Sequence, residues 1–326
     1  MTRSSDRIVQ AVSSVAGQKQ LCREHFRMTL RLSSFPAAYP GQFVHLCPDR
    51  LVNITGTHAS NGTGFDAAKW VVDCAAPMLR RAFSIAGLRR DGEGVEIDVI
   101  YRVVGTATRW MEQLRAGDRL NLLGPLGGAW PIHPEKKTAL LVAGGVGLPP
   151  LLWLSETVAK HGKETVAFFG AQSGDLIPLT VLPSVSPDSS AQSARRCAEE
   201  FSKVGVPTVI STDDGTVGFR GHVGAALSAY LEANDCPGEE KVVYTCGPER
   251  MMRFVAGVCA TSGIRCYACV ERNMACGTGM CQSCVVPVAD SPSTDAWRYQ
   301  LCCSEGPVFD AACVLWDEPA RERRVI

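Results

Sequence analysis

Short segments with alternating apolar and polar residues dominate the first third of the chain. Residues 26–32 read Phe-Arg-Met-Thr-Leu-Arg-Leu, which is the pattern of a strand with one buried face. Comparable segments follow at 43–46, 81–86, 94–102 and 119–123. Strands at this spacing predict an antiparallel β-barrel or sandwich that begins near Gln20.

Two polar stretches interrupt the predicted elements. Residues 51–76 are rich in Asn, Thr, Gly and Ser, and we interpret them as a loop inserted into the barrel. Residues 183–192 are rich in Ser and Pro, which favours a second loop insertion.

After residue 134 the pattern changes to strands that alternate with helices. The predicted strands are 138–142, 165–169, 208–211 and 241–245, and the predicted helices are 149–160, 223–232 and 248–262. Alternation of this kind predicts a doubly wound, mostly parallel α/β sheet. The chain therefore divides into a predicted β-barrel domain at 1–134, an α/β domain at 135–262 and a small C-terminal domain at 263–326.

Composition restricts the partners and the location. The 33 basic residues balance the 33 acidic ones, so no overall positive charge favours nucleic acid or an anionic membrane. The longest apolar stretch, residues 139–154, is interrupted by three Gly and two Pro, which argues against a membrane span. Residues 1–20 lack the apolar run of a secretory signal, so we expect a cytoplasmic protein.

Cysteines carry the strongest chemical signal. Eight of the fifteen lie in the last 61 residues, and in a reducing compartment such crowding indicates a metal centre rather than disulfides. Cys276, Cys281 and Cys284 form a C-x4-C-x2-C array with Cys303 further on, the ligand order of plant-type [2Fe–2S] clusters. Gly277 and Gly279 allow the tight turn that points backbone N–H groups at sulfur.

Other interpretations of these cysteines remain open. Cys266-x2-Cys269 and Cys281-x2-Cys284 resemble the two halves of a zinc site, although that site leaves Cys276 unused. Structural or redox cysteines are a third possibility, and Cys302 competes with Cys303 as the fourth cluster ligand. The seven cysteines scattered through the rest of the chain are interpreted as small buried apolar residues.

Two glycine-containing turns follow predicted strands of the α/β domain. The turn that contains Gly145 and Gly147 precedes a helix, so its backbone and the helix N-terminus suit a pyrophosphate, although an ordinary tight turn has the same pattern. The acid expected about 20 residues later is absent apart from Asp175. Cys246 and Gly247 follow another strand, which predicts that they lie on the same sheet edge.

The barrel segment offers two weaker motifs. Arg81, Phe83 and Ser84 place a cation, an aromatic ring and a hydroxyl on one predicted strand. Gly105, Thr106 and Thr108 precede a helical pattern at 109–114, a plausible phosphate-binding helix start. Taken singly, such residues are usually solvated surface residues.

In series, these motifs resemble the ferredoxin–NADP reductase superfamily, and the cysteine segment is similar to that of the electron transfer subunits of type B dihydroorotate dehydrogenases. The resemblance extends from about Val15 onward. The segments that carry it are 40–44, 81–85, 101–108, 124–127, 144–150, 212–215, 245–250 and 274–309.

This resemblance implies three cofactors. It places FAD on the barrel, at Arg81, Phe83, Ser84, Gly105, Thr106 and Thr108. It places NAD on the α/β domain, at Gly145, Gly147, Cys246 and Gly247, and a [2Fe–2S] cluster on Cys276, Cys281, Cys284 and Cys303. Ala82 and Ala107 depart from the usual proline and glycine, which loosens the local geometry without removing a polar ligand.

The resemblance also implies a partner and a function. The partner is a catalytic dihydroorotate dehydrogenase subunit that carries FMN, in a heterotetramer of two plus two subunits. Electrons pass through the cluster and FAD to NAD, because a flavin can collect single electrons and deliver a hydride. No residue is nominated as an acid or base catalyst.

One further point follows from the residues, and the resemblance leaves alternatives open. Asp213 and Asp214 come directly after a strand and would repel the 2′-phosphate of NADP, although three arginines could offset this, namely Arg195, Arg196 and Arg250. The alternatives are a subunit of an NADPH–ferredoxin oxidoreductase or sulfide dehydrogenase, in which an acid tends to replace the first cluster cysteine, and a zinc-stabilised module without redox activity.

Overall fold

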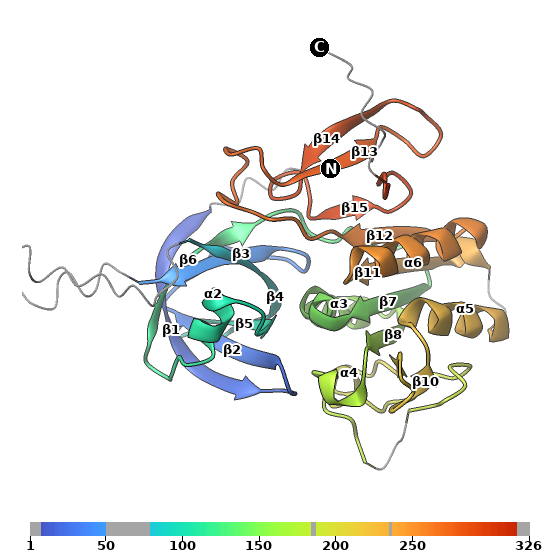
Figure 1. Cartoon of the computed structure of the whole chain (residues 1–326), viewed down its shortest axis with the longest axis horizontal. Helices are drawn as coiled ribbons and strands as arrows, with labels where there is room; N and C mark the ends of the chain where they lie inside the picture. The colour runs from blue at the N-terminus through green and yellow to red at the C-terminus, as the bar shows by residue number, and fades with distance from the viewer. Residues whose placement is uncertain (1–7, 50–78, 184–186, 235–236, 318–326) are drawn as a thin grey trace, which may run out of the picture.

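The molecule consists of a barrel, an α/β sheet beside it and a small C-terminal part that contacts both (Figure 1). The computed structural model describes residues 8–49, 79–183, 187–234 and 237–317. The predicted loop at 51–76 lies outside the described residues, as do Cys74 and Cys236.

Six antiparallel strands close the barrel in the order β1-β2-β5-β4-β3-β6, which confirms the predicted antiparallel barrel. Their bounds are β1 Val9–Gln20, β2 His25–Leu32, β3 Phe43–Pro48, β4 Arg81–Arg90, β5 Val95–Arg102 and β6 Arg119–Leu126. Met28, Leu30, Ile97 and Val99 are fully buried inside it. The alternating residues of the sequence therefore line the barrel core.

The first strand was not predicted, because the sequence placed the start of the barrel near Gln20. β1 pairs with β2 on one side and with β6 on the other, and this non-local pairing closes the barrel. Only Ser13 and Val15 of β1 are buried, so its sequence lacks a regular apolar face. The Ser13 hydroxyl donates to the Leu120 carbonyl at 3.2 Å, which satisfies a polar group inside the barrel.

Seven strands form the second sheet, in the order β10-β9-β8-β7-β11-β12-β15. The strands are β7 Thr138–Gly144, β8 Glu164–Ala171, β9 Thr208–Thr212, β10 Phe219–Arg220, β11 Lys241–Cys246, β12 Arg265–Cys269 and β15 Val308–Asp310, and only β15 among them is antiparallel to its neighbour. The helices are α3 Leu148–Lys160, α4 Glu199–Ser202, α5 Val223–Ala233 and α6 Glu249–Thr261, and the barrel carries α2 Thr106–Met111. Single 3₁₀ turns lie at Gly145–Gly147, Gly174–Leu176 and Gly238–Glu240.

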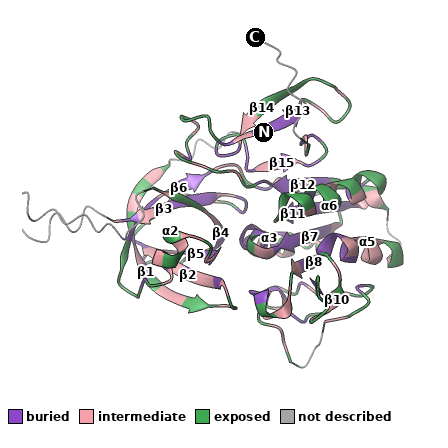
Figure 2. Ribbon diagram, in the orientation of Figure 1, coloured by how far each residue is buried: buried purple, intermediate pink, exposed green. Residues whose placement is uncertain are grey.

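Helices cover both faces of this sheet, so the doubly wound prediction is confirmed. Residues of α3 and α4 pack into one core, and residues of α5 and α6 pack into the other. The central strands are therefore buried almost throughout, as Figure 2 shows for β7, β8 and β11. Near-continuous apolar strands are what such burial requires.

The C-terminal part is tied to both neighbours. β13 Val285–Ala289 and β14 Trp297–Leu301 form a hairpin, and β15 then returns to the large sheet beside β12. Phe43 and Leu126 of the barrel share a hydrophobic core with Phe309 of this part. The Gly128 N–H donates to the Gly306 carbonyl at 2.6 Å, so backbone as well as side chains join the two.

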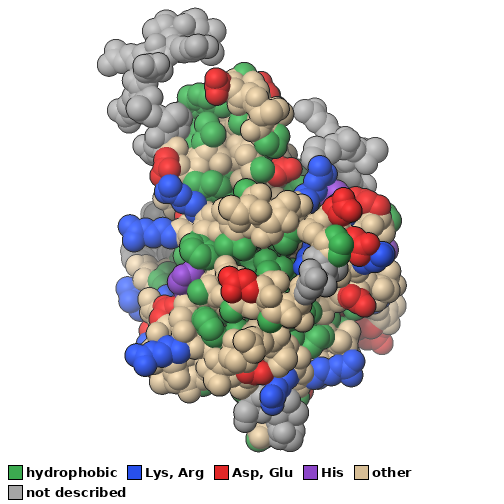
Figure 3. Space-filling view, turned by 90° about the vertical axis from the view of Figure 1, so that its right-hand side faces the viewer, with side chains coloured by type: hydrophobic (Ala, Val, Ile, Leu, Met, Phe, Trp, Pro, Cys, Tyr) green, Lys and Arg blue, Asp and Glu red, His purple; other side chains and the backbone are tan. Residues whose placement is uncertain are grey.

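Further contacts fix the barrel against the α/β sheet. Trp153 of α3 is buried in the core of the barrel, and Ala86 of the barrel is buried in the core beneath α3. Arg23 at the β1–β2 turn forms a 2.8 Å ion pair with Asp175. Positive and negative side chains are interspersed on the face that Figure 3 shows, in keeping with the balanced charge. No helix in the described ranges combines the length and apolar character that a membrane crossing needs.

Candidate functional site

The loop between β12 and β13 carries the predicted cluster cysteines, and backbone N–H groups point at their sulfurs. The N–H groups of Thr278 and Cys281 each lie 3.4 Å from the Cys276 sulfur. The Gly279 N–H lies 3.2 Å from the Cys303 sulfur, and the Cys303 N–H lies 3.4 Å from the Cys284 sulfur. Such N–H groups stabilise the thiolate form that ligates metal.

The four sulfurs are arranged as two interacting pairs. Cys276 interacts with Cys281, and Cys284 interacts with Cys303. Burial raises the pKa of Cys276, but the N–H groups of Thr278 and Cys281 outweigh it and lower that pKa to about 6. Among the described residues no three His, Cys, Asp or Glu side chains are grouped to hold one ion. Two pairs of cysteine sulfurs are the donor set that two irons require, so the residues fit a [2Fe–2S] cluster.

Gly277 and Gly279 shape this loop as the sequence predicted. Their φ angles are +73° and +86°, a region that residues with a Cβ rarely adopt. A Cβ on Gly277 would lie 2.7 Å from the ring of His45, which belongs to barrel strand β3. The loop therefore rests directly on a barrel histidine that sequence reasoning did not single out.

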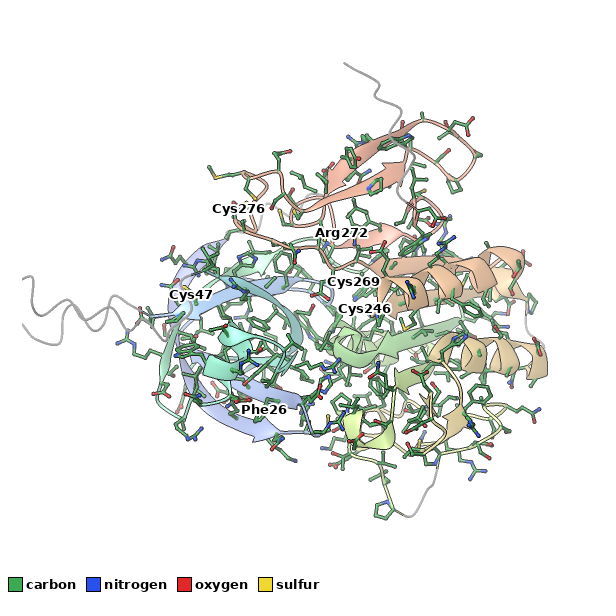
Figure 4. All side chains as sticks on the ribbon, in the orientation of Figure 1. Phe26, Cys47, Cys246, Cys269, Arg272 and Cys276 are labelled. Carbon is green, nitrogen blue, oxygen red and sulfur yellow. The ribbon has the colours of Figure 1, made fainter. Side chains whose placement is uncertain are left out.

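The zinc interpretation is wrong, because its first two ligands face opposite sides of the sheet. Cys266 is buried in the core beneath α5 and α6, beside Cys259. Cys269 is buried in the other core, beside Cys246 of the adjacent strand. Figure 4 shows Cys246 and Cys269 side by side in the sheet, away from Cys276.

The structure also separates the two candidates for the fourth ligand. Cys302 is completely buried, and its thiol donates to the Val270 carbonyl at 3.0 Å. Burial raises the pKa of both Cys302 and Cys303 to about 12, so their hydrogen bonds, and not their pKa values, distinguish the two thiols. The Cys303 sulfur instead faces the Gly279 N–H of the cysteine loop, so Cys303 is better placed than Cys302 to be the fourth cluster ligand.

The two turns of the α/β domain meet at the carboxyl edge of the sheet. A Cβ on Gly147 would lie 2.0 Å from the Cys246 carbonyl oxygen, so the glycine turn packs directly on the end of β11. Gly145 and Gly247 have φ angles of +52° and +151°. Cys246 is 9% exposed and lies where β11 ends. This arrangement brings Gly145, Gly147, Cys246 and Gly247 together at the edge where dinucleotides bind.

Charged residues near this edge separate into two groups. Asp213 and Asp214 are exposed directly after β9. Arg195 pairs with Thr208 at the opposite end of that five-residue strand, about 13 Å away at 3.3 Å per residue. Arg195 therefore lies at the far end of the strand from the two carboxylates, and whether any of the three arginines offsets them stays a prediction. Asp175 forms its ion pair with Arg23 of the barrel, so it serves the domain junction.

The barrel motifs approach one another at the start of β4. Arg81, Ala107 and Trp110 line one small hollow, and Trp110 was not identified from the sequence. Phe83 packs edge-on against Tyr101, with ring centroids 6.1 Å apart, and Ser84 pairs with Phe43 of β3. These contacts bring the two predicted FAD motifs to one side of the barrel.

The helix that follows Gly105 begins earlier than predicted. α2 starts at Thr106 rather than near Arg109. The Thr108 hydroxyl accepts from the N–H groups of Val104 and Gly105 at 2.9 and 3.1 Å, which caps the helix start. The Thr108 hydroxyl therefore fixes the turn that leads into α2, and Gly105 and Thr106 lie in that turn.

A barrel joined to a doubly wound domain, with a cysteine loop resting on both, defines a reductase-type oxidoreductase with an attached iron–sulfur domain. Residues 271–315 match the family model of the iron–sulfur cluster binding domain of dihydroorotate dehydrogenase B, and residues 141–257 match that of the oxidoreductase NAD-binding domain. The chain is 32% identical over 309 residues to the dihydroorotate dehydrogenase B (NAD(+)) electron transfer subunit of Lysinibacillus sphaericus, covering 94% of this chain and 99% of the relative. The chain belongs to this family of electron transfer subunits.

Other similar proteins agree with this assignment. The subunit of the same name from Bacillus cereus strain G9842 is 29% identical over 298 residues, covering 90% of this chain and 94% of the relative. Among solved structures, an NADH-dependent reduced ferredoxin–NADP oxidoreductase superposes with a TM-score of 0.71 at 22% identity, covering 94% of this chain and 91% of that one. The ferredoxin reductase of carbazole 1,9a-dioxygenase gives a TM-score of 0.57 at 17% identity, covering 79% and 67%. The two solved structures share the fold.

Proposed function

We propose that this chain transfers electrons from the flavin of a dihydroorotate-oxidising partner to NAD, by way of a [2Fe–2S] cluster and FAD. The observation that carries the proposal is the pairing of four cysteine sulfurs, three of which face backbone N–H groups, on the outer side of the barrel that bears the FAD motifs. When bound, the cluster supplies one-electron steps, and FAD converts them into hydride transfer.

The chain's own residues bind and orient the groups. The proposed cluster ligands are Cys276, Cys281, Cys284 and Cys303. The proposed FAD contacts are Arg81, Phe83, Ser84, Gly105, Thr106 and Thr108, and the proposed NAD contacts are Gly145, Gly147, Cys246 and Gly247. In this proposal residues 1–134 bind FAD, residues 135–262 bind NAD and residues 263–326 bind the cluster, and β12 and β15 of the last range also complete the sheet of the second. No side chain serves as an acid or base in this scheme, because positioning is what the transfers need.

The partner is proposed to be the FMN-carrying catalytic subunit, in a heterotetramer of two plus two subunits in the cytoplasm. The proposal places the segment 276–309 against this partner, because the cluster must lie close to the partner's flavin. Met280 in the cluster loop is 84% exposed, which supports an apolar contact there. Met274, by contrast, packs against the core and fills space inside the chain.

The dinucleotide is proposed to be NAD rather than NADP. Two exposed carboxylates follow β9, and the arginine at the far end of that strand is occupied by Asp188 at 3.6 Å. Comparison of flavin reduction rates with NADH and NADPH tests this point. A clear preference for NADPH would show that the carboxylates do not set the specificity.

The decisive experiment is the visible spectrum and cofactor content of the chain purified without oxygen. We expect one FAD, two irons and two labile sulfides per chain, and co-purification with a dihydroorotate-oxidising subunit when both are produced together. A colourless preparation without iron would refute the proposed function, since flavin and the cluster both absorb visible light. A full cofactor complement without coupling to dihydroorotate oxidation would refute the proposed partner.

A further inference from the structure

His45 occupies an unusual place between the barrel and the cluster loop. It lies in β3, opposite Ala82 of β4, the residue between Arg81 and Phe83 of the FAD motif. Its side chain points to the outer face of the barrel beside Phe43, with ring centroids 5.7 Å apart. On that face it meets the backbone of Gly277, where even a Cβ would approach the ring within 2.7 Å.

The ring of His45 is completely buried, and neither of its nitrogens has a hydrogen-bond partner among the described residues. Buried polar groups nearly always have a partner, and leaving one unpaired costs about 1–3 kcal/mol. His25 provides a comparison in the same barrel. It is 2% exposed, but its Nδ1 lies 3.1 Å from the Cys22 sulfur, so only its Nε2 lacks a partner.

The surroundings limit what can satisfy the His45 ring. Phe43 is apolar, and Ala82 offers only a methyl group. The N–H groups of the neighbouring loop residues Thr278 and Gly279 already point at cysteine sulfurs. The edge of the ring that carries both nitrogens lies against Gly277, the residue directly after the proposed ligand Cys276, where a Cβ would be 2.9 and 3.0 Å from Nε2 and Nδ1.

We propose that His45 donates a hydrogen bond from its imidazole N–H to a sulfur of the bound cluster, and that this bond raises the reduction potential of the cluster. The inference rests on the proposed function, because it requires the cluster. Reduction adds one negative charge to the iron–sulfur unit, and a donor aimed at sulfur stabilises that charge. Hydrogen bonds to sulfur are one of the ways in which proteins set the potentials of such clusters.

The same residue links the two proposed redox sites mechanically. His45 pairs with the strand that carries Arg81 and Phe83, and it touches the turn that follows Cys276. A hydrogen bond from its ring would hold the cluster against the FAD-bearing strand. His45 is therefore assigned both a tuning and a positioning role toward the cluster.

The test is a potentiometric titration of the cluster, followed by electron paramagnetic resonance in the whole purified complex. His45→Phe keeps the ring shape and removes the donor, and His45→Gln keeps an N–H donor. We expect about a tenfold loss in the equilibrium constant for one-electron reduction in His45→Phe, which is about 59 mV. We expect His45→Gln to retain most of the wild-type potential, and the matched control His25→Phe to leave it unchanged.

A second measurement uses the unaltered protein, so it does not depend on how a variant folds. With ¹⁵N-labelled histidine, pulsed electron paramagnetic resonance of the reduced cluster in the wild-type complex should show a weak ¹⁵N coupling, which unlabelled protein lacks. A fully loaded cluster with no such coupling, or a His45→Phe potential equal to that of wild type at full iron content, would overturn the inference. Absence of iron and sulfide from the wild-type protein would instead refute the proposed function itself.

Discussion

Replacement of Gly147 by alanine tests the geometry at the carboxyl edge of the α/β sheet. The added Cβ would lie 2.0 Å from the Cys246 carbonyl oxygen and 2.5 Å from the Gly247 nitrogen. Real Cβ contacts essentially never fall below 3.0 Å, so the backbone must open by at least 1 Å. Both obstructing atoms are main chain, so no side-chain rotation can relieve the clash. The φ of Gly147 is −75°, which makes the effect purely steric.

The expected magnitudes follow from this displacement. Overpacking of a tight interior costs about 1–3 kcal/mol of unfolding free energy. A displacement of about 1 Å at a reacting site lowers the rate about 100-fold. We therefore expect Gly147→Ala to reduce the rate of flavin reduction by NADH about 100-fold in a stopped-flow assay, with a lowered melting temperature.

Gly257→Ala is the matched control for the same chemical change. Gly257 lies in the middle of α6, it is exposed, and nothing lies within 4 Å of an added Cβ. Alanine at such a helical position stabilises by about 0.5–1 kcal/mol, and the rate with NADH should not change. If Gly147→Ala reacts with NADH and melts like the wild type, the proposed contact between the two turns does not position the dinucleotide.

Three other perturbations give separable outcomes. Cys281→Ser should remove iron and sulfide and abolish coupling to the partner, while FAD stays bound. The control Cys302→Ala should keep the iron. Retained NAD reduction from dihydroorotate in Cys281→Ser would contradict the ligand assignment. Asp213→Ser removes one exposed carboxylate, which would repel the 2′-phosphate of NADPH by about 1 kcal/mol at 4 Å in water. The rate of flavin reduction by NADPH should therefore rise about fivefold relative to the rate with NADH. An unchanged ratio of the two rates would show that Asp213 does not select against NADPH. Burial, aided by Arg102, lowers the pKa of His25 from 6.5 to about 4, so only the unfolded chain takes up this proton between those values. Stability should therefore fall on acidification from pH 6.5 to about 4, by up to about 1.4 kcal/mol per pH unit, and a His25→Phe variant with the same slope would contradict this.

Local patterns predicted most elements of the fold, and non-local pairing explains what they missed. The strands that became β2 and β5 were recognised because one face of each is apolar and buried. β1 was missed because its sequence lacks a regular apolar face, and because it is held in the barrel by non-local pairing with β2 and β6. The helix after Gly105 was placed three residues late, because the capping role of Thr108 is visible only in its hydrogen bonds.

In the candidate site, too, local sequence patterns were predictive and non-local contacts were not. The spacing of Cys276, Cys281 and Cys284 indicated the cluster from the sequence, because its ligands are local in the chain. Cys302 and Cys303 could not be separated in that way, since the difference is a hydrogen bond to Val270, 32 residues away in sequence. His45 was passed over for the same reason, because its significance depends on a loop more than 200 residues further along the chain.

The return of β15 to the large sheet has a practical consequence for making pieces of this protein. The chain leaves the sheet after β12, passes through the cysteine loop and the β13–β14 hairpin, and re-enters the sheet at β15. A truncation that ended at residue 262 would remove both β12 and β15 and leave the edge of β11 open, and such unprotected strand edges invite aggregation. The reductase half and the iron–sulfur half are thus interlocked parts that should be expressed together.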